Sequence, residues 1–272
     1  MNVISSLEVH PKSINCLKFF SSDRLITGSS DGIINIWNVQ SDISLITTII
    51  AHDGAICYIQ VINNGFLTCS VDKKIKLWSM VSNTCVNTFE EHKKTVWCLR
   101  LLSNDRYVSG SDDCKIKIWN MNSENCLKTL EGHTGGVFCI DFLPNSLLLS
   151  GSFDKSIRFW NMYSSTCIRI LEGHSSCILS LKILPKEKMI SISKDYQLKF
   201  WDINTGKCIK TNSDSDVEVN SVELLNNEKL FTAGSDGTVK IWTINLELLT
   251  TLKVHSSSIK CLNLYVEHLQ DK

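Results

Sequence analysis

Histidine, aspartate and serine or threonine recur along the chain at fixed spacing, and these are the residue types of a nucleophilic catalytic triad. In a triad, the histidine takes the proton of a serine hydroxyl and the aspartate orients the histidine ring. Five histidines each precede an aspartate by 20 or 21 residues, and a hydroxyl residue stands four residues before each of six aspartates. Six copies of one triad would be redundant in a single enzyme. The repetition therefore favours a packing role, and we expect no catalytic residue.

Tryptophan repeats with the same period. Six of the seven tryptophans are spaced by 41 residues, and each follows one of the six aspartates by six residues. The repeated histidines are His10, His52, His92, His133 and His174, and the hydroxyl residues are Thr27, Thr68, Ser109, Ser150, Ser191 and Thr232. The aspartates are Asp31, Asp72, Asp113, Asp154, Asp195 and Asp236, and the tryptophans are Trp37, Trp78, Trp119, Trp160, Trp201 and Trp242. The sequence is therefore built from six copies of one unit.

A period of about 41 residues is typical of the four-stranded blades of a β-propeller. The fourth unit contains the short runs VFCIDFL, LLLSGSFD, SIRFWNM and TCIRILEGH, which are rich in β-branched, aromatic and leucine residues and are separated by turn signals. None of them has the 3.6-residue apolar spacing of a helix. Such units cannot bury their faces alone. We therefore predict an all-β propeller that forms a single domain over residues 1–272.

Several short motifs resemble those of the WD-repeat (WD40) family of β-propellers. They are Leu-Glu-Gly-His at residues 130–133 and 171–174, Ser-Gly-Ser-x-Asp at 150–154, and Trp-Asp at 201–202. The resemblance covers nearly the whole chain, although only Trp201 is followed by aspartate and Gly-His is complete only in the fourth and fifth units. It implies that the histidine, hydroxyl, aspartate and tryptophan of a unit form one buried hydrogen-bond chain. Units one to five have all four residues, whereas the sixth has Ser215 in place of the histidine and is predicted to be the loosest.

The number of blades follows less directly from the sequence. We expect repeats over about residues 10–50, 51–90, 91–131, 132–172, 173–213 and 214–254. In the family, an outer strand precedes each histidine, so residues 1–9 and residues 255–266, which begin at His255, would form part of a seventh blade. Seven units of 41 residues need 287 residues, more than the 272 present. A seven-bladed ring with missing strands is favoured. The alternatives are a fragment, a strand donated to the last blade by a partner, or closure with six blades.

Composition excludes several function classes. Lys+Arg and Asp+Glu are both 28, so the chain has no basic excess with which to hold nucleic acid or a membrane. No apolar run approaches the ~18 residues of a membrane span. The chain has 12 cysteines without a CxxC pair, which argues against a metal site, and no cofactor is expected. We expect reduced thiols in a cytoplasmic or nuclear protein. Four cysteines at 41-residue spacing, Cys85, Cys126, Cys167 and Cys208, are predicted to share a buried position.

Partner specificity is expected at positions that the repeat leaves free. By the resemblance, the residues three and five positions after each histidine and the residue before each turn aspartate line the top of the central channel. These positions place aromatic and charged residues on the third to fifth units: Trp97, Phe138, Phe153, Leu179, Asp112 and Lys194. An aromatic cluster with charges at its rim is typical of a protein or peptide hot spot. We predict a non-enzymatic interaction scaffold within a larger complex. The alternatives are the substrate-recognition propeller of a ubiquitin ligase, similar to F-box proteins but without the F-box, and a histone or peptide reader subunit.

Overall fold

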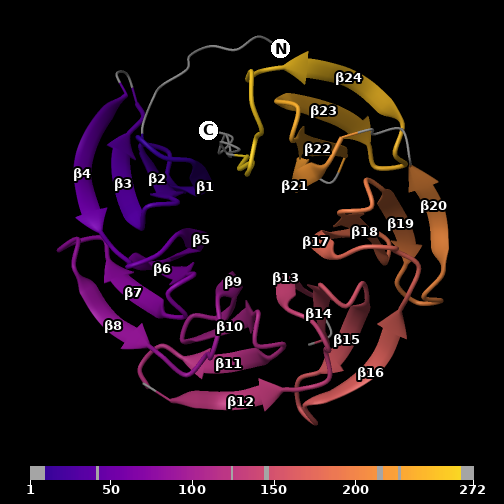
Figure 1. Cartoon of the computed structure of the whole chain (residues 1–272), viewed down its shortest axis with the longest axis horizontal. Helices are drawn as coiled ribbons and strands as arrows, with labels where there is room; N and C mark the ends of the chain where they lie inside the picture. The colour runs from indigo at the N-terminus through magenta and orange to yellow at the C-terminus, as the bar shows by residue number, and fades with distance from the viewer. Residues whose placement is uncertain are drawn as a thin grey trace, which may run out of the picture.

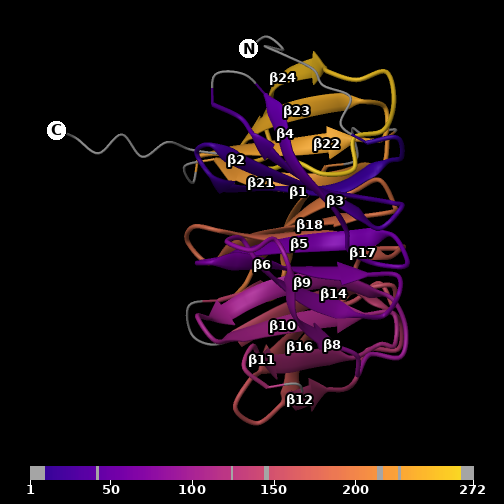
Figure 2. The same cartoon turned by 90° about the vertical axis from the view of Figure 1, so that its left-hand side faces the viewer.

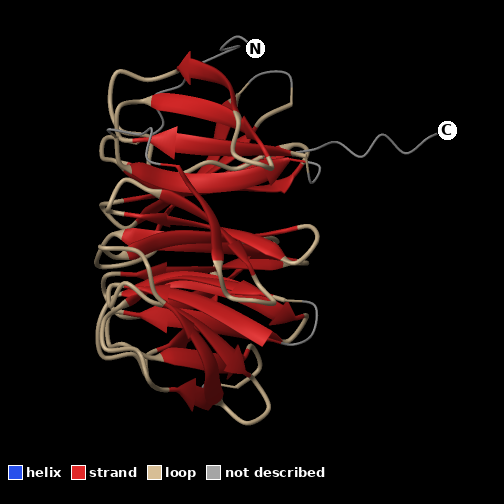
Figure 3. Cartoon of the chain, turned by 90° about the vertical axis from the view of Figure 1, so that its right-hand side faces the viewer, coloured by secondary structure: helices blue, strands red, loops and turns tan. Residues whose placement is uncertain are grey.

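The chain folds into β-sheets arranged as blades around a central channel (Figure 1). The structure is a computed structural model that describes residues 10–40, 43–123, 125–143, 147–212, 217–225 and 228–264. These residues form 24 strands in six antiparallel four-stranded sheets, each in the order of the sequence. In the side view of Figure 2, neighbouring blades lie one beside the next. Figure 3 draws only strands and loops, so the described residues include no helix that could cross a membrane.

Each blade runs from an innermost strand at the channel to an outer strand at the rim. Blade 1 contains β1 (Ile14–Ser21), β2 (Arg24–Ser29), β3 (Ile33–Asn38) and β4 (Ser44–Ile50). Blade 2 contains β5 (Ile56–Ile62), β6 (Gly65–Ser70), β7 (Ile75–Ser79) and β8 (Cys85–Phe89). Blade 3 contains β9 (Val96–Ser103), β10 (Arg106–Ser111), β11 (Ile116–Asn120) and β12 (Cys126–Leu130).

The second half of the ring repeats this order. Blade 4 contains β13 (Val137–Phe142), β14 (Leu147–Ser152), β15 (Ile157–Asn161) and β16 (Thr166–Leu171). Blade 5 contains β17 (Ile178–Leu184), β18 (Lys188–Ser193), β19 (Leu198–Asp202) and β20 (Cys208–Asn212). Blade 6 contains β21 (Val219–Leu225), β22 (Lys229–Gly234), β23 (Thr238–Thr243) and β24 (Leu248–Lys253).

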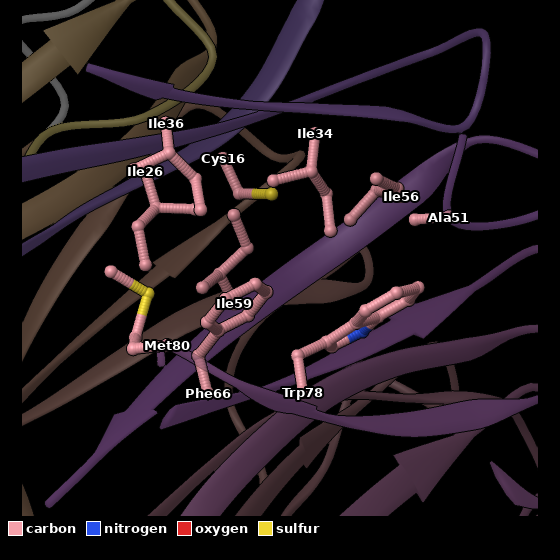
Figure 4. Packing of buried hydrophobic residues seen from close by; sticks show 10 residues of the cluster. All are labelled: Cys16, Ile26, Ile34, Ile36, Ala51, Ile56, Ile59, Phe66, Trp78 and Met80. Carbon is pink, nitrogen blue, oxygen red and sulfur yellow. The ribbon is translucent and has the colours of Figure 1, made fainter. Parts of the chain in front are cut away.

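The hydrophobic core is divided among the interfaces between blades. Figure 4 shows the cluster between blades 1 and 2, where Ile26, Ile34 and Ile36 of blade 1 meet Phe66 and Trp78 of blade 2. Similar clusters join blades 2 to 3, 3 to 4, 4 to 5 and 5 to 6. Each sheet buries apolar side chains on both faces against its neighbours, so the repeats stabilise one another and not themselves alone.

A small residue on the second strand makes room for a thiol on the innermost strand. Cys98 of β9 pairs with Gly110 of β10, and a Cβ on that glycine would lie 2.8 Å from the Cys98 Sγ. Blade 5 has the two sizes exchanged, because Ser180 of β17 pairs with Ile192 of β18. The combined volume of the pair therefore limits which residues fit at the two positions.

The interface between blades 6 and 1 is built differently from the other five. The coil after β24 descends between these blades, and its Ile259 and Leu262 cover the apolar face of blade 6 (Figure 1). Asn220 donates its side-chain N–H to the Ile259 carbonyl over 2.8 Å, just as Asn15 of β1 donates to the Ile56 carbonyl of β5 over 3.1 Å. We call residues 255–264 the seam segment. It takes the place that an innermost strand takes beside every other blade.

The favoured prediction of a seven-bladed ring is therefore wrong, and the six-bladed alternative is what the structure shows. The expected seventh innermost strand is the seam segment, which is not paired as a strand in the part of the chain described. A single segment without a neighbouring strand has no ladder of backbone hydrogen bonds to join. Residues 1–9 and 265–266, which were also assigned to the seventh blade, lie outside the described residues.

The cysteines with 41-residue spacing lie at the rim and not in a buried position, so that prediction is wrong. Cys85 and Cys208 are exposed, and Cys126 and Cys167 are half-buried. Each comes at the first or second residue of an outer strand, and its Sγ donates to the backbone carbonyl two residues later. All twelve cysteines are free thiols.

Candidate functional site: the central channel

The innermost strands and the seam segment enclose a cavity of about 580 Å³ in the channel. Its wall contains every residue that stands five positions after a repeated histidine or its equivalent. They are Asn15, Cys57, Trp97, Phe138, Leu179, Asn220 and Lys260. A volume of this size is typical of small-ligand and peptide-side-chain sites.

Aromatic side chains gather on blades 3 and 4 at one end of this cavity. The rings of Trp97 and Phe138 have centroids 5.0 Å apart, and Phe153 lies 6.5 Å from Phe138. Trp97 and Phe138 are half-buried, whereas Phe153 is 61% exposed. We call these three residues the aromatic ladder. It runs from the channel wall onto the face that carries the turns between the second and third strands, which is the top face.

The other predicted partner-binding residues lie around the ladder. Leu179 and Lys194 line the cavity, and Lys194 is exposed to solvent. Asp112 is half-buried, and its carboxylate lies directly against Gly136, the last residue of the β12–β13 connection. Phe153 and Asp112 stand outside the cavity wall. The top face thus combines an apolar surface with one acidic and one basic group.

A second set of channel residues forms a closed series of polar contacts, and sequence reasoning missed it. Arg100 donates to the Tyr58 hydroxyl, and its Nε lies 3.9 Å from Asp141. The Asp141 carboxylate accepts the backbone N–H of Ile183 in blade 5 over 3.2 Å. Most of the residues involved stand eight positions after a repeated histidine or its equivalent, and comparing that column of the repeat would have found them.

The series closes across the interface between blades 6 and 1. Glu223 of β21 binds Lys182 of β17 at 2.7 Å and Lys18 of β1 at 3.7 Å. The Lys18 ammonium in turn lies 5.6 Å from the centre of the Tyr58 ring. Each of the six innermost strands therefore contributes at least one member, and Lys18–Glu223 spans the interface that has no direct blade-to-blade core.

The repeated histidines form buried hydrogen-bond chains in blades 2 to 5. In blade 4, His133 Nδ1 is 2.7 Å from Asp154 and His133 Nε2 is 2.7 Å from the Ser150 Oγ, which also accepts the Trp160 indole N–H over 2.8 Å. The chains that contain His52, His92 and His174 have the same three contacts, two made by the histidine and one between the tryptophan indole and the hydroxyl. The aspartate carboxylate can only accept a hydrogen bond, so the histidine proton is on Nδ1. Nε2 therefore accepts a hydrogen bond from the serine or threonine hydroxyl.

Burial and hydrogen bonding set the charge states in these chains. Burial lowers the pKa of His133 and His174 and outweighs the opposite effect of the neighbouring aspartates. Burial also works to raise the pKa of Asp113, but hydrogen bonds from His92 and from two backbone N–H groups lower it to about 2. The lowered pKa values favour neutral imidazoles at His133 and His174 and an ionised carboxylate at Asp113 at neutral pH.

Blades 1 and 6 lack the complete chain. His10 keeps its contact with Thr27 at 2.8 Å, but its Nδ1 is buried without a partner among the described residues. Asp31 accepts instead from the Ser29 hydroxyl and the Ile33 N–H, so the expectation that unit one completes its chain does not hold. In blade 6, the Trp242–Thr232 bond remains and Asp236 accepts from Thr238. Ser215 lies outside the described residues.

The geometry of blades 2 to 5 resembles a catalytic triad without its chemistry. The Ser150 hydroxyl is 0% exposed, and it already contacts both the histidine and the indole. A nucleophile must reach its substrate with a free lone pair, and this oxygen cannot. The described residues also contain no group of three or more histidine, cysteine, aspartate or glutamate side chains that could hold a metal ion.

The architecture is that of a β-propeller with six blades. The WD domain, G-beta repeat family matches residues 1–38, 43–79, 83–120, 124–161, 165–202 and 206–243. The chain belongs to the WD40 repeat family. Proteins of this family are typically interaction domains that bind protein partners. No curated protein matches the chain in a comparison of sequences.

Proposed function

We propose that the protein is a non-enzymatic interaction scaffold that binds peptide or protein partners on the top face and along the blade rims, within a multi-subunit complex. The observation that carries the proposal is the aromatic ladder, in which three rings on two blades follow one another from the channel to an exposed phenylalanine. Large aromatic side chains at the centre of a surface supply most of the binding energy in protein interfaces.

The charges beside the ladder suit the same role. Asp112 and Lys194 lie on either side of blade 4 and carry opposite charge, so they orient a partner without attracting every acidic or basic chain. The buried hydroxyls and histidines are used in packing, which leaves them no part in catalysis. Free thiols and the family membership fit a cytoplasmic or nuclear protein, and we propose that location.

The test is the double variant Trp97→Ala/Phe138→Ala, compared with the wild type by affinity capture of partners and by thermal melting. We expect partner capture to be lost while the melting curve is unchanged. Ile168→Ala is the matched control, because Ile168 is 54% exposed on the outer strand β16, away from the channel. A lower melting temperature with unchanged capture would show that the two rings only fill space.

A second variant separates binding from packing more sharply. Phe153 is exposed, so Phe153→Ala removes binding surface with little loss of core packing. We expect weaker capture and the same melting temperature. If Phe153→Ala and Ile168→Ala capture partners equally well, the ladder is not the binding surface.

A further inference from the structure

Two cations in the channel wall lie against one tyrosine. The Lys18 ammonium is 5.6 Å and the Arg100 guanidinium 5.5 Å from the centre of the Tyr58 ring, and all three residues line the cavity. They come from β1, β5 and β9, the innermost strands of three consecutive blades. Their position is set by rigid strands and not by loops, which keeps the spacing between the charges fixed.

The charge of these two cations is only partly paired. Arg100 donates to the Tyr58 hydroxyl, and the nearest carboxylate oxygen among the described residues lies 3.9 Å from its Nε, on Asp141. Asp141 already accepts two backbone N–H groups, from Phe142 and Ile183. Lys18 shares the Glu223 carboxylate with Lys182. The Lys182 ammonium lies 2.7 Å from this carboxylate, whereas the Lys18 ammonium lies 3.7 Å from it.

The cavity wall also presents one donor without an acceptor. The indole N–H of Trp97 is buried and has no hydrogen-bond partner among the described residues. Trp97 and Arg100 are three residues apart on β9, which spans about 10 Å along a strand. A ligand that lies along β9 can therefore meet the indole at one end and the guanidinium at the other.

We propose that the channel cavity is an anion-binding site in which Lys18 and Arg100 hold a carboxylate or phosphate group beside Tyr58, with the aromatic wall of Trp97 and Phe138 above it. The group is carried either by a free small anion or by an acidic side chain of a bound peptide. Only the peptide source rests on the function proposed above. Charge-assisted hydrogen bonds from a lysine and an arginine in a concave site favour such groups over neutral ligands.

The channel offers a matched control for removal of a cation. Lys182 belongs to the same series of contacts as Lys18, but it is closely paired with Glu223 and does not line the cavity. Lys18→Met, Arg100→Met and Lys182→Met each remove one positive charge and keep a long apolar side chain. A thermal melting curve for each variant establishes that it is folded, and Arg100→Gln, which also removes the charge, serves in place of Arg100→Met if the latter is not.

The experiment measures binding of two kinds of probe by isothermal titration calorimetry at low salt. The free probes are pyrophosphate and citrate, and the peptide probes are short synthetic peptides with a central glutamate or phosphoserine, each matched by a glutamine or serine version. We expect Lys18→Met and Arg100→Met to weaken binding about tenfold or more, the effect of losing a charge-assisted hydrogen bond. Lys182→Met should bind as the wild type does.

The outcomes distinguish the source of the anion from failure of the proposal. Binding of pyrophosphate or citrate with this pattern of variants supports a small-anion site, even if the aromatic ladder captures no partner. Binding of only the acidic peptides with the same pattern supports a peptide-borne group. If no probe binds, or if all three variants weaken binding equally, the proposal is overturned.

Discussion

Blades 2 to 5 cover their apolar faces in one way, and the pair formed by blades 6 and 1 does so in another. In the first group, the histidine chain is complete and each blade packs its core directly against the next. At the interface between blades 6 and 1, the seam segment covers the apolar face, and the histidine chains of both blades are incomplete. A repeat protein closed into a ring therefore does not have uniform stability.

Outer-strand cations connect blades 3, 4 and 5 to the next blade at the rim. The Lys128 ammonium donates to the Met162 and Tyr163 carbonyls of the next blade, and Arg169 does the same to Ile203 and Asn204. Thr47, Asn87 and Thr250 stand at the corresponding positions of blades 1, 2 and 6. A threonine side chain is too short for this contact, so the seam also lacks a connection between neighbouring blades at the rim.

Removal of a histidine should have the largest effect where the chain is complete. His133→Ala leaves Asp154 and Ser150 buried without their partner, so we expect the free energy of unfolding to fall by about 3 kcal/mol. His10→Ala removes one contact with Thr27 from a half-buried residue and should cost about 1 kcal/mol. Urea unfolding followed by tryptophan fluorescence measures both values. Equal losses would show that the missing Asp31 contact makes no difference.

Acid should reduce stability mainly through the complete chains. The pKa of His133 and of His174 is lowered in the folded protein, so their contribution is present above about pH 6.5 and is lost as the pH falls below it. Asp113 has a folded pKa of about 2, so its contribution of about 2 kcal/mol is present above about pH 4 and is lost as the pH falls towards 2. Melting temperatures between pH 7 and 2 should decrease accordingly.

The variant Asp113→Asn tests the part of the pH dependence of stability that lies below about pH 4. It should be less stable than the wild type at neutral pH, and its melting temperature should fall less steeply below about pH 4. Asp53→Asn, which changes an exposed carboxylate, is the matched control and should follow the wild-type curve. A variant curve parallel to the wild type at every pH would contradict the assignment of this dependence to Asp113.

Two asparagines in equivalent positions test the seam directly. Asn220→Ala removes the bonds to Ser258 and Ile259, and we expect amide hydrogen exchange in residues 257–264 to accelerate about tenfold, an effect of about 1.4 kcal/mol. Asn15→Ala removes the corresponding bond to Ile56, but Ile56 belongs to β5, which is paired with β6. Exchange in β5 should therefore change little. Similar acceleration at both sites would remove the distinction between the seam and the other interfaces.

The smallest expected change in stability concerns a buried hydroxyl group inside blade 3, which packs directly against both of its neighbours. The Tyr107 hydroxyl is fully buried and has no hydrogen-bond partner among the described residues, whereas other blades have leucine, phenylalanine or methionine at this position. Tyr107→Phe should therefore raise the free energy of unfolding by about 1 kcal/mol. Tyr163→Phe, at an 81% exposed residue, should leave it unchanged. A destabilised Tyr107→Phe would indicate that the hydroxyl does have a partner.

The sequence predicted the repeat more reliably than it predicted how the repeat closes. The 41-residue period correctly indicated four strands per blade, and the position five residues after each histidine lies in the channel wall. The blade count failed because His255 was taken to open a blade, whereas the seam segment that begins there is not paired as a strand in the described residues. A period shows which residues are equivalent, but not whether a segment finds a strand to pair with.

Two further predictions from the sequence were wrong for the same reason, because equivalent positions in a repeat need not have the same surroundings. Cys85 and Cys208 repeat as regularly as the tryptophans, and a regular period does not distinguish the rim from the core. Asp31 has the expected spacing from His10, but Ser29 and Ile33 occupy its carboxylate. Competition between nearby hydrogen-bond partners depends on atomic distances, which spacing along the chain does not contain.

The paired sizes on the first two strands of each blade restrict how such repeats can diverge. A larger residue at Gly110 would meet the Cys98 thiol, so it requires a change on β9 at the same time, and blade 5 has the reversed combination of Ser180 and Ile192. A single substitution at either position gives a protein whose pair is either overpacked or leaves a cavity. Blades can therefore exchange these residues by duplication of a whole unit more easily than by independent point mutations.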